Sequence, residues 1–150
     1  MISAPLVQGE DILKFIPQRD PIVMVDTLFA CEEKSASTGL SVSNVNELFL
    51  DQGKILESGL IEHMAQSCAV HAGYAPLLAN YQSAKKPTMG FIAEVKSLKV
   101  HHLPSTDRNL KTTIKVTNEV MNIIVVKCET EDESGPVCSC EMKIFLHSEG

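Results

Sequence analysis

The chain has 150 residues and a formal net charge of −6, with 44% hydrophobic and 21% charged residues. This length and composition are typical of one globular domain, so we expect a single domain over residues 1–150. The negative charge argues against nucleic-acid binding, which needs a basic face. The sequence has neither a long apolar run nor the basic start of a secretion signal, so we expect a cytoplasmic protein without a membrane segment.

The first half of the chain predicts a short helix, a hairpin and one long helix. Residues 9–17 (GEDILKFIP) are amphipathic, with acidic residues in the first turn. The apolar segment 21–33 (PIVMVDTLFACEE) predicts a strand that pairs with 35–44 (SASTGLSVSN) as a hairpin. After a connection, the segment that begins ESGLIEHMAQ predicts a helix over about 57–78, with Ser58 as a candidate cap.

The second half predicts four antiparallel strands, separated by turns rich in polar residues, Gly and Pro. These strands are expected at 88–102, 110–122, 123–132 and 137–147. The long helix is apolar on most sides, so the sheet should wrap around it. The order of elements indicates an α+β fold. A wrapped sheet leaves an exposed edge strand, which a homodimer or higher homo-oligomer would cover.

The five cysteines are odd in number and show no CxxC pair, so a disulfide framework is not expected. Cys138 and Cys140 alternate with Ser139 and Glu141 and should share one face of a strand. We interpret them as buried small hydrophobic residues. A thiolate metal site is the alternative, but no second ligand pair is visible, so neither a metal nor another cofactor is expected.

Three segments resemble a known enzyme family. ILKFIPQRDPIVMVD (12–26) is similar to its N-terminal motif, GLIEHMAQ (59–66) to the start of its central helix, and GFIAEVKSLKVHHLPSTDRNLKTTIKV (90–116) to the strands that follow. The family is the 3-hydroxyacyl-acyl-carrier-protein dehydratases, and the chain looks closest to the aryl-polyene branch. The resemblance implies a hotdog fold, an antiparallel sheet wrapped round one long helix, with active-site tunnels at a dimer interface.

Dehydration of a 3-hydroxyacyl thioester needs a base for the α-proton, an acid for the leaving hydroxyl and donors for the thioester oxygen. The resemblance implies that Glu62 is the acid. Helical spacing places Gln66 on the same face, where it can hold Glu62 or the substrate. Amides near a helix start, at Ser58 and Gly59, are suited to binding the thioester oxygen. The structural alternative is that Glu62 only complements the helix dipole.

The chain departs from the family where the base should be. No histidine lies between Asn44 and Leu60, which excludes the family's glycine-histidine-phenylalanine-proline-glycine loop. Gln18 replaces a histidine of the N-terminal motif, and an amide is no base near neutral pH. Candidate substitutes are Asp51, if burial raised its pKa, and His63, if it reached a partner's site. The remaining candidates are His71, His101 and His102.

Three functions follow from these features. The first is a dehydratase-like enzyme of fatty-acid or polyene biosynthesis, acting on a thioester of acyl carrier protein or coenzyme A. The second is a hotdog thioesterase that uses Glu62 and needs no histidine. The third is a non-catalytic acyl-thioester-binding subunit that partners an active paralogue. The middle of the chain carries a group of basic residues: Lys85, Lys86, Lys96, Lys99, Arg108 and Lys111. They either form a rim that attracts an acidic carrier protein or are ordinary solvated cations.

Overall fold

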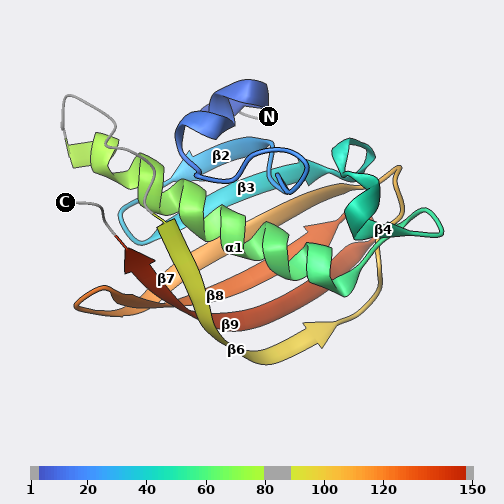
Figure 1. The fold of residues 1–150 in the computed structure, drawn as a ribbon. Helices are drawn as coiled ribbons and strands as arrows, with labels where there is room; N and C mark the ends of the chain where they lie inside the picture. Colours follow the sequence, from blue (N-terminus) through green and yellow to red (C-terminus); the bar gives the residue numbers. More distant parts are fainter. Residues whose placement is uncertain (1–3, 80–88, 148–150) are drawn as a thin grey trace.

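The computed structural model describes residues 4–79 and 89–147. One long helix lies against the concave face of a seven-stranded antiparallel sheet, with strand order β1-β2-β3-β7-β8-β9-β6 (Figure 1). The expected α+β arrangement is therefore confirmed. The strands of this sheet are β1 (Val7–Gln8), β2 (Thr27–Cys31), β3 (Ser35–Ser41), β6 (Met89–Val100), β7 (Asn109–Val120), β8 (Ile123–Asp132) and β9 (Gly135–His147).

The long helix α1 spans Glu57–Tyr74 and continues as the 3-10 helix η4 over Ala75–Ala79. The predicted helix over about 57–78 is thus confirmed in position. Its last turns tighten beside Pro76, whose nitrogen cannot donate to the helix ladder. The prediction that Ser58 caps the helix is wrong, because Leu56 is the N-cap and no side chain bonds there. Ser58 instead lies within the first turn and is exposed.

The N-terminal segments differ from expectation in two places. The first helix is a 3-10 helix, η1 (Gly9–Lys14). The strand expected over 21–33 is confined to β2, Thr27–Cys31. Before it, the Met24 N–H donates to Gln66 Oε1 at 2.6 Å, and the Met24 carbonyl accepts from His63 Nδ1 at 2.6 Å. Side chains of α1 therefore satisfy the Met24 backbone groups that a longer strand would have paired with a neighbouring strand.

The connection between β3 and α1 contains two 3-10 helices and a small hairpin. The 3-10 helices are η2 (Val42–Asn44) and η3 (Glu47–Phe49), and the hairpin pairs β4 (Leu50–Asp51) with β5 (Lys54–Ile55). Val45 and Ile55 bury their side chains, which fixes this connection on the core. It therefore sets the point at which α1 begins.

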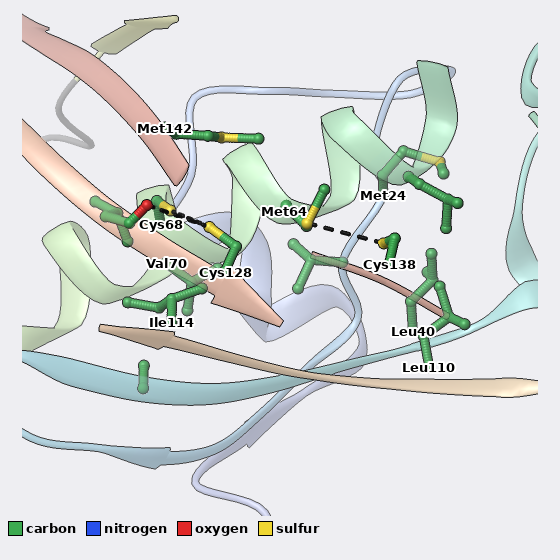
Figure 2. Packing of buried hydrophobic residues seen from close by; sticks show 14 of the residues in the cluster. Met24, Leu40, Met64, Cys68, Val70, Leu110, Ile114, Cys128, Cys138 and Met142 are labelled. Carbon is green, nitrogen blue, oxygen red and sulfur yellow. Dashed lines mark hydrogen bonds between the residues drawn. The ribbon is translucent and has the colours of Figure 1, made fainter. Parts of the chain in front are cut away.

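The core lies between α1 and the inner face of the sheet, as Figure 2 shows. The thiol groups of Cys138 and Cys140 donate hydrogen bonds to the sulfur of Met64, at 3.9 Å and 3.8 Å. The sulfur atoms of Cys68 and Cys128 lie 3.8 Å apart. The two cysteines of the CSC segment are buried as small apolar residues, as predicted. Among the described residues, no group of three or more histidine, cysteine or acidic side chains is placed to hold a metal ion.

Strand β6 is the last strand of the sheet and pairs only with β9 in the described strand order. Its outward-facing Phe91 is 52% exposed and lies opposite Phe145, which is 40% exposed. An apolar edge of this kind favours association with another chain. The homodimer itself stays a prediction. No helix in the described part of the chain is long and apolar enough to cross a bilayer.

Candidate active site

A small cavity of about 70 Å³ lies between α1 and the strands β8, β9 and β6. We call it the Glu62 cavity. Its polar lining comes from Glu62 on the helix and from Gln18, which follows η1. The remaining described lining residues are small or apolar: Ala65, Cys68, Ala69, Gly90, Ile92, Ile124, Ile144 and Leu146. The cavity is therefore a small apolar space whose lining includes two polar residues.

Glu62 is held in place by Gln66, one turn along α1. Gln66 Nε2 donates to Glu62 Oε1 at 2.7 Å and to the Ile22 carbonyl at 2.7 Å, and its Oε1 accepts from the Met24 N–H. These bonds use both amide protons of Gln66 and one acceptor position of its oxygen, and the residue is completely buried. Gln66 therefore holds Glu62, one of the two roles considered for it, and a contact between Gln66 and substrate stays a prediction.

The small residues on the Glu62 face of α1 serve two purposes. Ala65 and Ala69 line the Glu62 cavity and leave its volume open. Further along, a Cβ placed on Gly73 would lie 2.5 Å from the Phe15 carbonyl oxygen, so glycine there permits close approach of the backbone that follows η1. The space beside these small residues is therefore an open cavity near Ala65 and Ala69. Near Gly73 it is occupied by the Phe15 backbone.

Gln18, from the segment that follows η1, also lines this cavity. Gln18 Oε1 is buried and has no hydrogen-bond partner among the described residues. A buried acceptor without a donor is unfavourable, and such atoms are uncommon in folded proteins. Its position shows that the residue replacing the family histidine faces the same space as Glu62.

His63, by contrast, points into the core. It is completely buried, with Nδ1 donating to the Met24 carbonyl and Nε2 accepting from Thr112 Oγ1 at 2.7 Å. Thr130 donates in turn to Thr112 Oγ1 at 2.6 Å. Burial lowers the pKa of His63, so the neutral ring that this chain of hydrogen bonds requires is favoured. Both ring nitrogens are used in the fold, which leaves neither for a proton transfer in the Glu62 cavity.

Asp51, Ser58 and Gly59 also lie apart from the Glu62 cavity. Asp51 is exposed in the β4–β5 hairpin, so it lacks the burial on which its candidate role as a base depended. Ser58 is exposed, and Gly59 is buried where a Cβ would lie 3.0 Å from Ile55 and 3.2 Å from Met24. None of the three is among the described residues that line the cavity. In this chain Gly59 is a packing residue.

The other histidines hold turns or face solvent. His71 Nε2 lies 2.9 Å from the Glu32 carbonyl, at the β2–β3 turn, and burial lowers its pKa. His102 Nε2 lies 2.9 Å from Asp132 Oδ2, near the β8–β9 turn. His101 is exposed. None of them is in the described lining of the Glu62 cavity. Of the cations considered as a carrier rim, Lys85 and Lys86 lie outside the described residues.

The cavity walls on the sheet were not predicted as site residues. Alternation along β8 and β9 does place Ile124 and Ile144 on the inner face, but it does not distinguish a cavity wall from the packed core. Ile92 and Gly90 come from β6, and a Cβ on Gly90 would lie 3.2 Å from Ile144. Glycine at position 90 thus keeps this end of the cavity open.

The sequence of residues 10–149 matches the ApeP-like family, described as ApeP dehydratase. The chain belongs to this family. Among solved structures, it is similar to the dehydratase heterocomplex ApeI:P from Xenorhabdus doucetiae, with a TM-score of 0.78 at 15% identity over 98% of this chain and 93% of that one. The predicted relationship to the aryl-polyene branch of dehydratases is confirmed, and a dehydratase-like function is supported.

Two further solved structures share the fold at lower similarity. One is a hypothetical thioesterase with coenzyme A from Streptococcus pneumoniae TIGR4, with a TM-score of 0.59, 14% identity and coverage of 81% of this chain and 84% of that one. The other is the PaaI protein of E. coli, from a phenylacetic acid degradation operon, with a TM-score of 0.61, 12% identity and coverage of 83% and 80%. The predicted hotdog fold is confirmed. Among curated proteins, none matches this sequence.

Proposed function

We propose that this chain is the acid-bearing subunit of a 3-hydroxyacyl-thioester dehydratase, with Glu62 as the general acid. The observation that carries the proposal is the position of Glu62. It is the one acidic side chain among the described residues that line an otherwise largely apolar cavity, and Gln66 fixes one of its oxygens at 2.7 Å. Membership of the ApeP-like dehydratase family supports this assignment.

In the proposed reaction a base removes a proton from C2 of the acyl chain. Glu62 gives its proton to the 3-hydroxyl, the C3–O bond breaks, and water leaves with a C2–C3 double bond formed. Because Gln66 holds Glu62 Oε1, the orientation of the carboxyl group is fixed, and the other carboxyl oxygen is the one proposed to donate the proton. The apolar wall formed by Ile92, Ile124 and Ile144 suits the acyl chain itself.

The base is proposed to come from a second subunit. No histidine is found in the described lining of the Glu62 cavity, and the cavity reaches the edge strand β6 at Gly90 and Ile92. A neighbouring chain placed along that edge could contribute a histidine. The similar ApeI:P structure is a dehydratase heterocomplex, which favours a second, different subunit over two copies of this chain. An acyl carrier protein thioester is the proposed substrate form.

Mass spectrometry of the acyl-carrier species tests this function. The chain alone, a histidine-bearing dehydratase partner alone, and the two together are supplied with a 3-hydroxyacyl carrier protein. We expect the mixture to remove water from the substrate. This dehydration should stop when this chain carries Glu62→Gln. The proposal is wrong if the partner alone is as active as the mixture, or if Glu62→Gln leaves the rate of the mixture unchanged.

A thioesterase is the second candidate, because a carboxylate beside an apolar cavity can activate water without a histidine. The thioesterase neighbour with coenzyme A shares the fold with this chain. Release of carrier protein without its acyl group, dependent on Glu62, would favour hydrolysis over dehydration. The same mass spectra distinguish the two reactions, since dehydration leaves the acyl group attached to the carrier.

A further inference from the structure

His63 follows the proposed acid in the sequence, but its ring is completely buried in the core, and the proposed reaction does not use it. His63 Nδ1 lies 2.6 Å from the Met24 carbonyl oxygen. A carbonyl can only accept, so this bond requires a proton on Nδ1. The Thr112 hydroxyl lies 2.7 Å from Nε2 and donates to it, which favours this tautomer. The ring is therefore held as a fixed donor to Met24.

Met24 is held by two side chains of α1 at once. Its carbonyl accepts from His63, and its N–H donates to Gln66 Oε1 at 2.6 Å. His63 and Gln66 are three residues apart and therefore neighbours on the helix surface. Met24 has no exposed area, so bulk water does not compete for either bond. Both polar groups of the Met24 backbone are thus fixed against α1.

The Met24 N–H sets the direction of the Gln66 amide. With Oε1 turned to this N–H, Nε2 faces Glu62 Oε1 and the Ile22 carbonyl, each at 2.7 Å. An amide rotated by half a turn would place its oxygen against two other acceptors and its N–H groups against a donor. The bond from Gln66 to Glu62 therefore depends on the position of the Met24 N–H.

Resting on the proposed dehydratase function, we propose that His63 is a positioning residue for the general acid Glu62. It acts through the backbone of Met24, which in turn sets the Gln66 amide. Without the His63 donor, the Met24 carbonyl is a buried acceptor that must move to find another partner. The Met24 N–H moves with it, and the Gln66 amide loses its fixed direction. A displacement of about 1 Å at a reacting group can cost about a hundredfold in rate.

Two substitutions at His63 separate its two hydrogen bonds. The amide nitrogen of Asn is as many bonds from the backbone as His Nδ1, so His63→Asn keeps a donor for Met24 and loses the contact with Thr112. The amide of Gln is one bond longer and matches His Nε2, so His63→Gln keeps the Thr112 contact and loses the donor for Met24. The two bonds have similar lengths, 2.6 and 2.7 Å, so we expect both variants to lose similar stability.

The test measures kcat and KM for dehydration of a 3-hydroxyacyl carrier protein, with this chain and an excess of the histidine-bearing partner. We expect His63→Gln to lower kcat about ten- to a hundredfold and to leave KM within about twofold, because placement of the acid matters only in the transition state. His63→Asn should rescue kcat to within about threefold of the unaltered chain. A role in stability alone would leave the kcat of both folded variants unchanged.

The matched control is His101→Gln, which makes the same change at an exposed histidine and should keep both constants. The inference is overturned if His63→Gln keeps its kcat, or if His63→Asn is slowed as much as His63→Gln. The dehydratase function then still stands on the activity of the unaltered chain. An unaltered mixture that removes no water would overturn the proposed function, and the inference with it.

Circular dichroism and thermal unfolding check that each variant is folded at the assay temperature. If His63→Gln is unfolded there, His63→Leu takes its place, because an apolar side chain suits this buried position and offers Met24 no donor. The same fall in kcat is expected. An unchanged kcat in His63→Leu would overturn the inference in the same way.

Discussion

Gln66 donates its side-chain amide to the Glu62 carboxylate at 2.7 Å, one turn along the same helix. The same amide bonds the Ile22 carbonyl and the Met24 N–H, in the segment that precedes β2. The orientation of the proposed acid is therefore tied to the packing of an element more than forty residues earlier. Substitutions at these two positions should separate chemistry from stability.

Gln66→Met should destabilise the protein by about 2–4 kcal/mol. It leaves the Met24 N–H and the Ile22 carbonyl without partners in a buried place, at about 1–3 kcal/mol for each group. Urea unfolding followed by circular dichroism measures this difference. An unfolding free energy equal to that of the unaltered chain would show that water or another group replaces the amide.

Glu62→Gln should abolish dehydration while changing stability by less than about 1 kcal/mol. The new amide oxygen can still accept from Gln66 Nε2, so the local hydrogen bond survives while the ionisable proton is lost. The variant is thus the matched control for Gln66→Met. Equal destabilisation of both variants would mean that the charge of Glu62 matters to the fold as well.

Ala69→Leu should fill the Glu62 cavity of about 70 Å³ and weaken acyl-thioester binding at least about tenfold. Added methyl groups in a cavity can raise stability by about 0.5–2 kcal/mol, so we expect unchanged or higher thermal stability. Calorimetric titration and thermal unfolding give the two quantities. Ala30→Leu, at an exposed position of β2, serves as the control and should bind normally. Unimpaired binding by Ala69→Leu would place the acyl chain elsewhere.

Gly73→Ala should destabilise the protein by about 1–3 kcal/mol, although alanine is the better helix former by about 1 kcal/mol. The added Cβ would lie 2.5 Å from the Phe15 carbonyl oxygen, too close for contact without a backbone shift. Denaturant unfolding provides the measurement. If Gly73→Ala is instead more stable, the segment around Phe15 moves aside easily and helix propensity dominates.

Asp132→Asn should remove a pH-dependent part of the stability. Burial alone would raise the pKa of the Asp132 carboxyl, but hydrogen bonds from His102 and from the side chain and backbone of Ser134 outweigh it and lower the pKa to about 2 from 3.8. The ionised group therefore stabilises the fold above its unfolded pKa, and this contribution is lost as pH falls through the folded pKa. The pKa shift corresponds to roughly 2 kcal/mol at most, and solvent screening at this partly exposed site reduces the contribution below that.

Urea unfolding at neutral pH and at several values between pH 4 and pH 2 tests this linkage. The unaltered chain should be more stable than Asp132→Asn at neutral pH, and the difference should shrink between about pH 4 and about pH 2. A difference that stays constant over this range would show that the hydrogen-bond geometry, and not the charge, carries the effect.

The sequence by itself determined the features that depend on neighbours along the chain. Alternation located the strands β7 and β8 to within a residue or two, and the spacing of four placed Glu62 and Gln66 on one helical face, where they are bonded. These relationships are fixed by 3.6-residue and two-residue repeats, which need no knowledge of the rest of the fold.

Only the tertiary structure decided the features that join distant segments. Gln18 meets the Glu62 cavity across more than forty residues, and the walls come from β6, β8 and β9. It was likewise the packing of α1 on the sheet that turned His63 towards Thr112 and away from Glu62. Periodicity states which face a side chain is on but not what covers that face, because the partner surface is set by how the whole chain packs.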